Sequence, residues 1–116
     1  MSDEDRVRIL HMLEAAETVA EFLETRSRED LDRDRMLLFA VVRAIEILGE
    51  AASKISLETR ATAPQVPWGA IISMRNRLIH GYFDTDTAIV WKTATTEIPA
   101  LFPILRALAD PSRDLT

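Results

Sequence analysis

The chain has 116 residues, of which 47% are hydrophobic and 28% are charged; this is the composition of one globular domain and excludes a largely disordered chain. It has no cysteine, which excludes disulfides, thiolate metal ligands and a cysteine nucleophile. The formal net charge of −5 excludes nucleic-acid binding by bulk electrostatics, since that binding depends on Lys and Arg facing phosphates. Any nucleic acid would need a local positive groove.

The amino-terminal half predicts two long helices. The first is expected from Asp3 to about Thr25, where apolar residues recur at steps of three and four. Ser27 is expected to cap the second helix, with Asp30 completing a loose capping box. That helix is expected to run unbroken from about Arg28 to Ile55. It carries two apolar stripes, Leu38, Val42, Ile45, Ala52 and Ile55 on one side and Met36, Phe39, Ile47 and Ala51 on the other. Two stripes predict either a central helix or, as we favour, one that packs on its own bundle and on a partner.

The carboxyl-terminal half predicts two more helices. Residues 56–66 are expected to connect them to the first pair, with one helical turn after Ser56. Pro67 suits the first turn of a third helix, and Gly81 can end that helix in a left-handed conformation. Asp84 or Asp86 is expected to begin the last helix, and the proline at position 99 to kink or break it.

The predicted fold is therefore all-α, a four- to five-helix up-and-down bundle that forms a single domain over residues 1–116. Residues 110–116 are expected to be a frayed tail. The start of the chain is too charged for a secretory signal and no long uncharged apolar run follows, so a cytoplasmic location without membrane contact is expected.

One short stretch concentrates groups that could carry chemistry: Arg75, Asn76, Arg77, His80 and Tyr82. Residues 73–83 contain no acid, so this is also the candidate positive groove. A histidine near a helix carboxyl terminus is held closer to its protonated form and can serve as a general acid or base. An arginine can clamp phosphate and stabilise negative charge in a transition state. This pair could cleave RNA without a metal, although a solvated helix end is the simpler structural alternative.

Helical geometry restricts how this pair can work. Five residues at about 100° each place Arg75 and His80 roughly 140° apart on an ideal helix. Asn76 and Arg77, four and three residues before the histidine, lie on its face. Arg75 and His80 can therefore converge only if the helix ends or unwinds near Ile79, or if two chains share the site.

Glu46 and Glu50 lie one helical turn apart, which is suitable spacing for a pair of metal ligands. No histidine or third acid accompanies them at helical spacing, so we favour a role as partners of Arg75 or Arg77, across the bundle or within a dimer. No metal site and no cofactor are expected.

Three other residues are expected to be structural. His11 has no obvious partner and is predicted to be structural or exposed. Trp68 and Trp91 are predicted to be core anchors, with base stacking as the alternative.

The run Arg75-x4-His80-x-Tyr82 resembles the RX4HXY signature of HepT toxins in the HEPN superfamily. Three further phrases resemble the same family in the same order, at residues 44–52, 66–72 and 84–91. The resemblance implies a homodimer whose two signatures face one cleft. It implies a metal-independent endoribonuclease toxin in which Arg75 and His80 are catalytic and Asn76, beside the arginine, either orients it or contacts RNA phosphate. Arg77 is not fixed by the signature, and we expect it to bind phosphate. The resemblance also implies a MntA-like nucleotidyltransferase antitoxin that neutralises the toxin by transferring AMP from ATP onto Tyr82.

Two other functions use the same residues differently. A non-catalytic subunit of a nucleotidyltransferase would bind nucleotide or phosphate at the signature without cutting RNA. An interaction scaffold would carry the signature as an inert remnant, but it would have no chemical need for Arg75, His80 and Tyr82 together.

Overall fold

The computed structural model describes residues 1–79 and 86–110, and every regular element in these ranges is helical. The predicted all-α class is thus confirmed. In chain order the helices are α1 (Asp3–Leu23), α2 (Arg28–Arg33), α3 (Arg35–Ser53), α4 (Leu57–Ala61), α5 (Trp68–Ile79), α6 (Thr87–Lys92), a π-helical turn η1 (Thr93–Glu97), a 3-10 turn η2 (Pro99–Leu101) and α7 (Phe102–Ala109).

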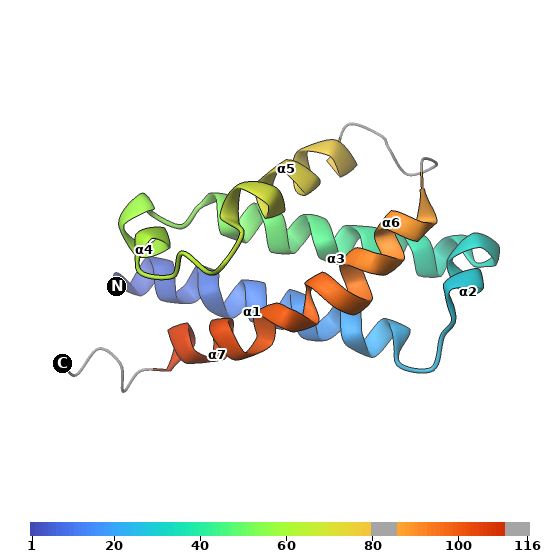
Figure 1. Cartoon of the computed structure of the whole chain (residues 1–116), viewed down its shortest axis with the longest axis horizontal. Helices are drawn as coiled ribbons and strands as arrows, with labels where there is room; N and C mark the ends of the chain where they lie inside the picture. Colours follow the sequence, from blue (N-terminus) through green and yellow to red (C-terminus); the bar gives the residue numbers. More distant parts are fainter. Residues whose placement is uncertain (80–85, 111–116) are drawn as a thin grey trace.

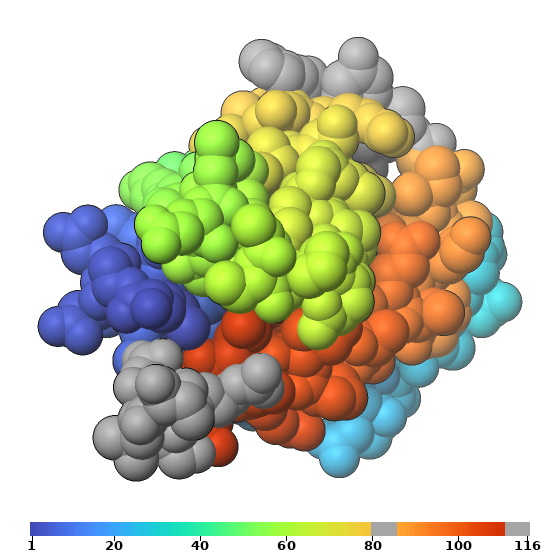
Figure 2. All heavy atoms as spheres, turned by 60° about the vertical axis from the view of Figure 1, so that its left-hand side comes forward, coloured from blue at the N-terminus to red at the C-terminus, as the bar shows by residue number. Residues whose placement is uncertain are grey.

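The long helices α1 and α3 lie side by side and form the base of the bundle (Figure 1). α5 packs on α3, whereas α7 packs on α1 and α6 lies over α2. Figure 2 shows α4 and α5, in green to yellow, at the surface between α1 and the last helical segment. α5, which carries the start of the signature, therefore rests mainly on α3.

The predicted unbroken second helix is wrong, because the chain divides at Asp34. This residue has an extended backbone (φ −113°, ψ 98°), and its carboxylate accepts a hydrogen bond from the Leu37 amide at 3.1 Å. Asp34 thus caps α3 at the expense of helix continuity, as aspartate often does. The capping box ahead of α2 is confirmed, with the Ser27 amide donating to Asp30 Oδ2 at 2.8 Å.

The predicted break near the proline at position 99 is confirmed. A π-helical turn precedes Pro99 and a 3-10 turn starts at it. Proline has no amide to donate, and its ring clashes with the carbonyl four residues earlier, so a regular helix cannot pass through it. The last helix does begin with Asp86, whose carboxylate accepts from the Ala88 amide at 2.9 Å.

The core is centred on the interface between α1 and α3, and its largest fully buried side chains include Ile9, Met12, Val41, Leu48 and Leu105. Trp68 is buried and donates from its indole nitrogen to the Ala63 carbonyl at 3.1 Å, so the core-anchor prediction is confirmed for it. Trp91 is half-buried and packs against the same core.

The second apolar stripe of α3 is largely uncovered. The exposed fractions are 84% for Met36, 47% for Phe39 and 41% for Ile47, whereas Ala51 is buried. The first stripe, by contrast, supplies much of the core. A partner on the uncovered stripe stays a prediction.

Asp5 is a buried carboxylate that ties the start of α1 to the start of α4. Its oxygens accept hydrogen bonds from the Ser56 amide at 3.1 Å and from the hydroxyls of Ser56 and Thr59, each at 2.6 Å. Burial by itself raises the pKa of Asp5, but these hydrogen bonds outweigh burial, so the pKa lies below its ordinary value. Asp5 is therefore a charged link between segments far apart in sequence.

Candidate functional site

The described part of the signature lies on the last two turns of α5. Arg75, Asn76 and Arg77 belong to this helix, whose last residue is Ile79. His80 and Tyr82, like the predicted cap at Gly81, lie outside the described residues. The structure therefore places the predicted catalytic arginine and both predicted phosphate-binding residues, and leaves the roles of all five as predictions.

Arg75 points toward α3 and is held from two sides. Its Nη2 forms an ion pair with Glu50 Oε2, and its Nη1 donates to Asn76 Oδ1 at 2.7 Å. Its Nε is buried and has no hydrogen-bond partner among the described residues. A guanidinium has five N–H donors, so these two bonds leave three for other acceptors. Arg75 is thus fixed in position while keeping donors that could bind phosphate.

Glu50 is the acid that fixes Arg75, which confirms the predicted pairing of these two residues. The hydrogen bond from Arg75 is the main reason that the pKa of Glu50 lies below its ordinary value. Partial burial works in the opposite direction, and Lys54, whose Nζ lies 3.4 Å from the other carboxylate oxygen, lowers the pKa further. Glu50 therefore stays ionised at neutral pH and offers Arg75 a permanent counter-charge.

Gly49 allows this arrangement, because it lets the backbones of α3 and α5 approach closely. A Cβ at position 49 would overlap Arg75 Cβ and would lie 2.9 Å from Arg75 Cγ and 3.2 Å from the Ile71 carbonyl oxygen. The sequence interpretation did not assign Gly49 any role. A usable signal existed, since glycine inside a helix costs about 1 kcal/mol relative to alanine and needs a reason to be there.

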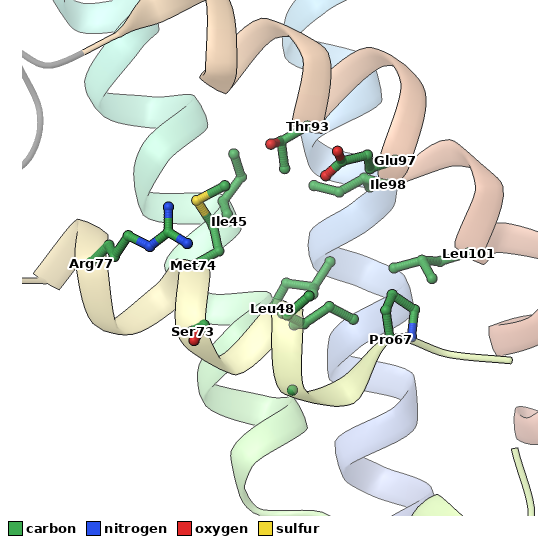
Figure 3. Close-up of a pocket in the computed structure, with 13 residues that line it drawn as sticks. Ile45, Leu48, Pro67, Ser73, Met74, Arg77, Thr93, Glu97, Ile98 and Leu101 are labelled. Carbon is green, nitrogen blue, oxygen red and sulfur yellow. The ribbon is translucent and has the colours of Figure 1, made fainter. Parts of the chain in front are cut away.

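Arg77 lies on the other side of α5. Two residues at about 100° each turn its side chain roughly 200° away from that of Arg75. Arg77 is exposed and lines a hollow of about 370 Å³ between α5 and the segment from η1 to η2 (Figure 3). The structure thus keeps Arg75 and Arg77 apart, although both were assigned to one positive stretch.

A second groove, of about 320 Å³, lies between α1 and α3 and includes Glu50, the partner of Arg75. Arg8 and His11 of α1 meet Arg43 and Glu46 of α3 there, and Ile79 forms its α5 edge. Glu46 pairs with Arg43 at 3.4 Å, so the predicted alternative pairing of Glu46 with Arg75 or Arg77 is not observed. His11 is exposed, as expected. Sequence reasoning missed Arg8 and Arg43 because they meet only through the packing of two helices.

In the part of the chain that the structure describes, no group of three or more His, Asp or Glu side chains is arranged to hold a metal ion. No helix in residues 1–79 or 86–110 has the length and apolarity needed to cross a membrane.

Comparison with known proteins decides the family. The family described as "Ribonuclease HepT-like" matches residues 12–108. The chain belongs to the HepT-like ribonuclease family. No solved structure gave a significant match.

Named relatives cover most of the chain. A Thermococcus cleftensis protein named "Probable ribonuclease HepT" is 41% identical over 88 residues, which are 76% of this chain and 80% of that protein. A Methanocaldococcus jannaschii protein named "Putative RNase MJ1380" is 36% identical over 102 residues, which are 87% of this chain and 94% of that protein. The resemblance drawn from the signature is thus confirmed at the level of the family.

Proposed function

We propose that the chain is a metal-independent endoribonuclease toxin that acts on RNA in the cytoplasm. The observation that carries the proposal is the geometry of Arg75, which Glu50 and Asn76 hold in place within the RX4HXY signature of a ribonuclease family. An arginine fixed in this way loses little freedom when it binds phosphate, and it needs no reorganisation in the transition state.

In this mechanism His80 and Arg75 divide the work. His80 moves the proton of the attacking 2′-hydroxyl or of the leaving oxygen, and Arg75 stabilises the negative phosphorane. Asn76 and Arg77 contribute phosphate contacts. Arg75 and His80 require either a change of direction after Ile79 or a second protomer in order to meet on one phosphate.

A homodimer fits the surface of α3. Met36, Phe39 and Ile47 are exposed on one side of this helix, with the exposed Arg43 between Phe39 and Ile47, and Ile79 at the end of α5 is 49% exposed across the groove from Ile47. Covering such a surface removes apolar area from water. A second copy on this face would bring two signatures close to one another.

The direct test is digestion of total RNA by the purified chain in EDTA. Wild type is expected to cleave, whereas Arg75→Ala and His80→Ala chains purified in the same way are expected to leave the RNA intact. Cleavage by all three would indicate a contaminating nuclease, and cleavage by none would refute the proposal. Expression of the chain without its proposed antitoxin should also arrest growth. If expression is harmless and the purified chain does not cleave RNA, the alternative is favoured, a nucleotide- or phosphate-binding subunit of a nucleotidyltransferase.

The proposed regulation is transfer of AMP from ATP onto the Tyr82 hydroxyl oxygen by a MntA-like nucleotidyltransferase antitoxin, with release of pyrophosphate and the hydroxyl proton. An AMP group on Tyr82 would place a phosphodiester two residues from His80, where it would compete with RNA for the arginines. Intact mass should rise by one or more AMP units after incubation with the antitoxin and ATP. A Tyr82→Phe chain should keep its original mass, and a shift that persists in it would move the modification to another residue.

A further inference from the structure

The hollow on the Arg77 side of α5 is a pocket with mostly apolar walls. Ile45 and Leu48 of α3 form its base, Met74 of α5 lies on one side, and Ile98 and Leu101 lie on the other (Figure 3). Its volume of about 370 Å³ lies at the lower end of the range found for small-molecule sites. That size suits one compact ring system.

Small residues keep the α5 side of this pocket open. Gly69, Ala70 and Ser73 all line it, and a Cβ added at Gly69 would meet nothing within 4 Å. The opposite wall contains the π-helical turn η1, which carries Thr93 and Glu97 toward the hollow. Turns of this kind occur often at functional sites.

Polar groups surround the apolar base. Arg77 lies at one end of the pocket, and Glu97 and Thr93 lie across from it (Figure 3). Among the described residues, the side chains of Arg77, Glu97, Thr93 and Ser73 have no hydrogen-bond or ion-pair partner. Thr93 is buried, whereas Ser73, Arg77 and Glu97 are exposed. An apolar hollow with a few convergent polar groups is the usual form of a ligand site.

We infer that this pocket binds one ribonucleotide unit, with the base in the apolar hollow and a phosphate on Arg77. The inference rests on the proposed function, which supplies RNA as the source of that unit. In the sequence, His80 follows Arg77 by three residues, so the pocket adjoins the signature along the chain.

Glu97 gives the pocket a base preference. An ionised carboxylate can only accept hydrogen bonds, and it pairs with the exocyclic amino group of cytosine. Uracil presents a carbonyl oxygen where cytosine has that amino group, so the two oxygens would face each other. The pocket therefore selects bases with an amino group over uracil.

Filling the pocket at Gly69 tests this assignment. Gly69→Leu places a side chain in open space, while Gly69→Ala adds one methyl group at the same helical position and serves as the matched control. Both are made in a His80→Ala chain so that RNA stays intact. Fluorescence anisotropy then compares a short labelled oligocytidine with an abasic ribose-phosphate strand of equal length.

The control is expected to bind oligocytidine about tenfold more tightly than the abasic strand, which is the range of one buried base. Gly69→Leu is expected to bind both strands equally. Equal discrimination by the two variants would overturn the inference. Circular dichroism verifies that each is folded, and because leucine favours helix over glycine, a folded Gly69→Leu chain is expected.

Glu97→Gln provides a second, independent test, because glutamine has nearly the same shape as glutamate. The parent His80→Ala chain should prefer oligocytidine to oligouridine, and Glu97→Gln should lose that preference because an amide can also donate. An unchanged preference would overturn the role of Glu97. Displacement of the labelled RNA by excess cytidine monophosphate would show that free nucleotides also enter, and its absence would restrict the site to RNA.

The outcomes separate this inference from the proposed function. If the otherwise wild-type chain cleaves RNA and Gly69→Leu leaves kcat and KM unchanged, the pocket assignment fails while the ribonuclease proposal stands. If the wild-type chain does not cleave but the base discrimination is observed, the pocket stands as a nucleotide site and the ribonuclease proposal fails.

Discussion

Replacing Gly49 by alanine is expected to lower the rate of RNA cleavage by about 100-fold, although the substitution adds only one methyl group and lies outside the signature. The methyl group would overlap Arg75 Cβ and crowd the Ile71 carbonyl. The positions of these atoms are fixed by the α5 backbone and cannot be changed by rotating a side chain, so α5 must move away from α3. A displacement of about 1 Å at a catalytic group costs about 100-fold in rate.

The effect on stability is expected to be smaller than the effect on activity. Overpacking costs about 1–3 kcal/mol, and removing a glycine from a helix interior returns about 1 kcal/mol. The free energy of unfolding should therefore change by at most about 2 kcal/mol, as measured by urea titration. The loss of activity should fall on kcat more than on KM, because Arg75 is proposed to act in the transition state.

Gly69→Ala is the matched control for this prediction. It makes the same chemical change in a helix where a Cβ meets nothing within 4 Å. Because Gly69 lies in the first turn of α5, its replacement should change the free energy of unfolding by less than about 1 kcal/mol. Arg75 should keep its position, so kcat should fall far less than in Gly49→Ala. Equal activity of the two alanine variants would contradict the role assigned to the close approach at Gly49.

Asp5→Ala is expected to destabilise the fold by about 3–5 kcal/mol, which is a large part of the stability of a domain of this size. The carboxylate accepts three hydrogen bonds in a site where only 6% of the residue surface is exposed. Hydrogen bonds to a charged group contribute about 1.5–3 kcal/mol each, and they are not additive. Without Asp5 the Ser56 amide and the buried Thr59 hydroxyl lose their acceptor.

The contribution of Asp5 to stability should also depend on pH. Since the folded-state pKa of Asp5 lies below the ordinary value of an aspartate, its charge contributes stability that is fully present above the unfolded pKa. That contribution is lost as the pH falls through the folded pKa. Urea unfolding followed between neutral and acidic pH should therefore show a gap between wild type and Asp5→Ala that narrows below about pH 4. Asp3→Ala, which changes an exposed acid in the same helical turn, should shift stability by less than about 1 kcal/mol, and an equally large effect there would assign the loss to the helix dipole.

Much of the fold was predictable because its signals are local. The capping pair of Ser27 and Asp30, the start at Asp86 and the break at Pro99 each depend on a few neighbouring residues, and each was predicted. The division at Asp34 was missed because the apolar pattern continues across it, and only the competition between its side chain and the helix decides the outcome.

The site was less predictable, because its geometry depends on contacts between helices. The pairing of Glu50 with Arg75 could be anticipated from charge alone. The close approach at Gly49 could not, and neither could the separation of Arg77 into its own pocket, since both depend on which side of α5 faces α3. The predicted convergence of Arg75 and His80 stays a prediction.

The packing of α1 against α7 has a consequence for synthesis of the protein. Arg6, near the start of α1, donates to the Ala109 carbonyl at the end of α7 at 3.2 Å. Translation at about 5–20 residues per second therefore separates the two helices by roughly 5–20 s. During that interval the α1 surface that α7 covers is open on the ribosome. The bundle can close only once α7 has been synthesised, so the packing of α1 is complete only then.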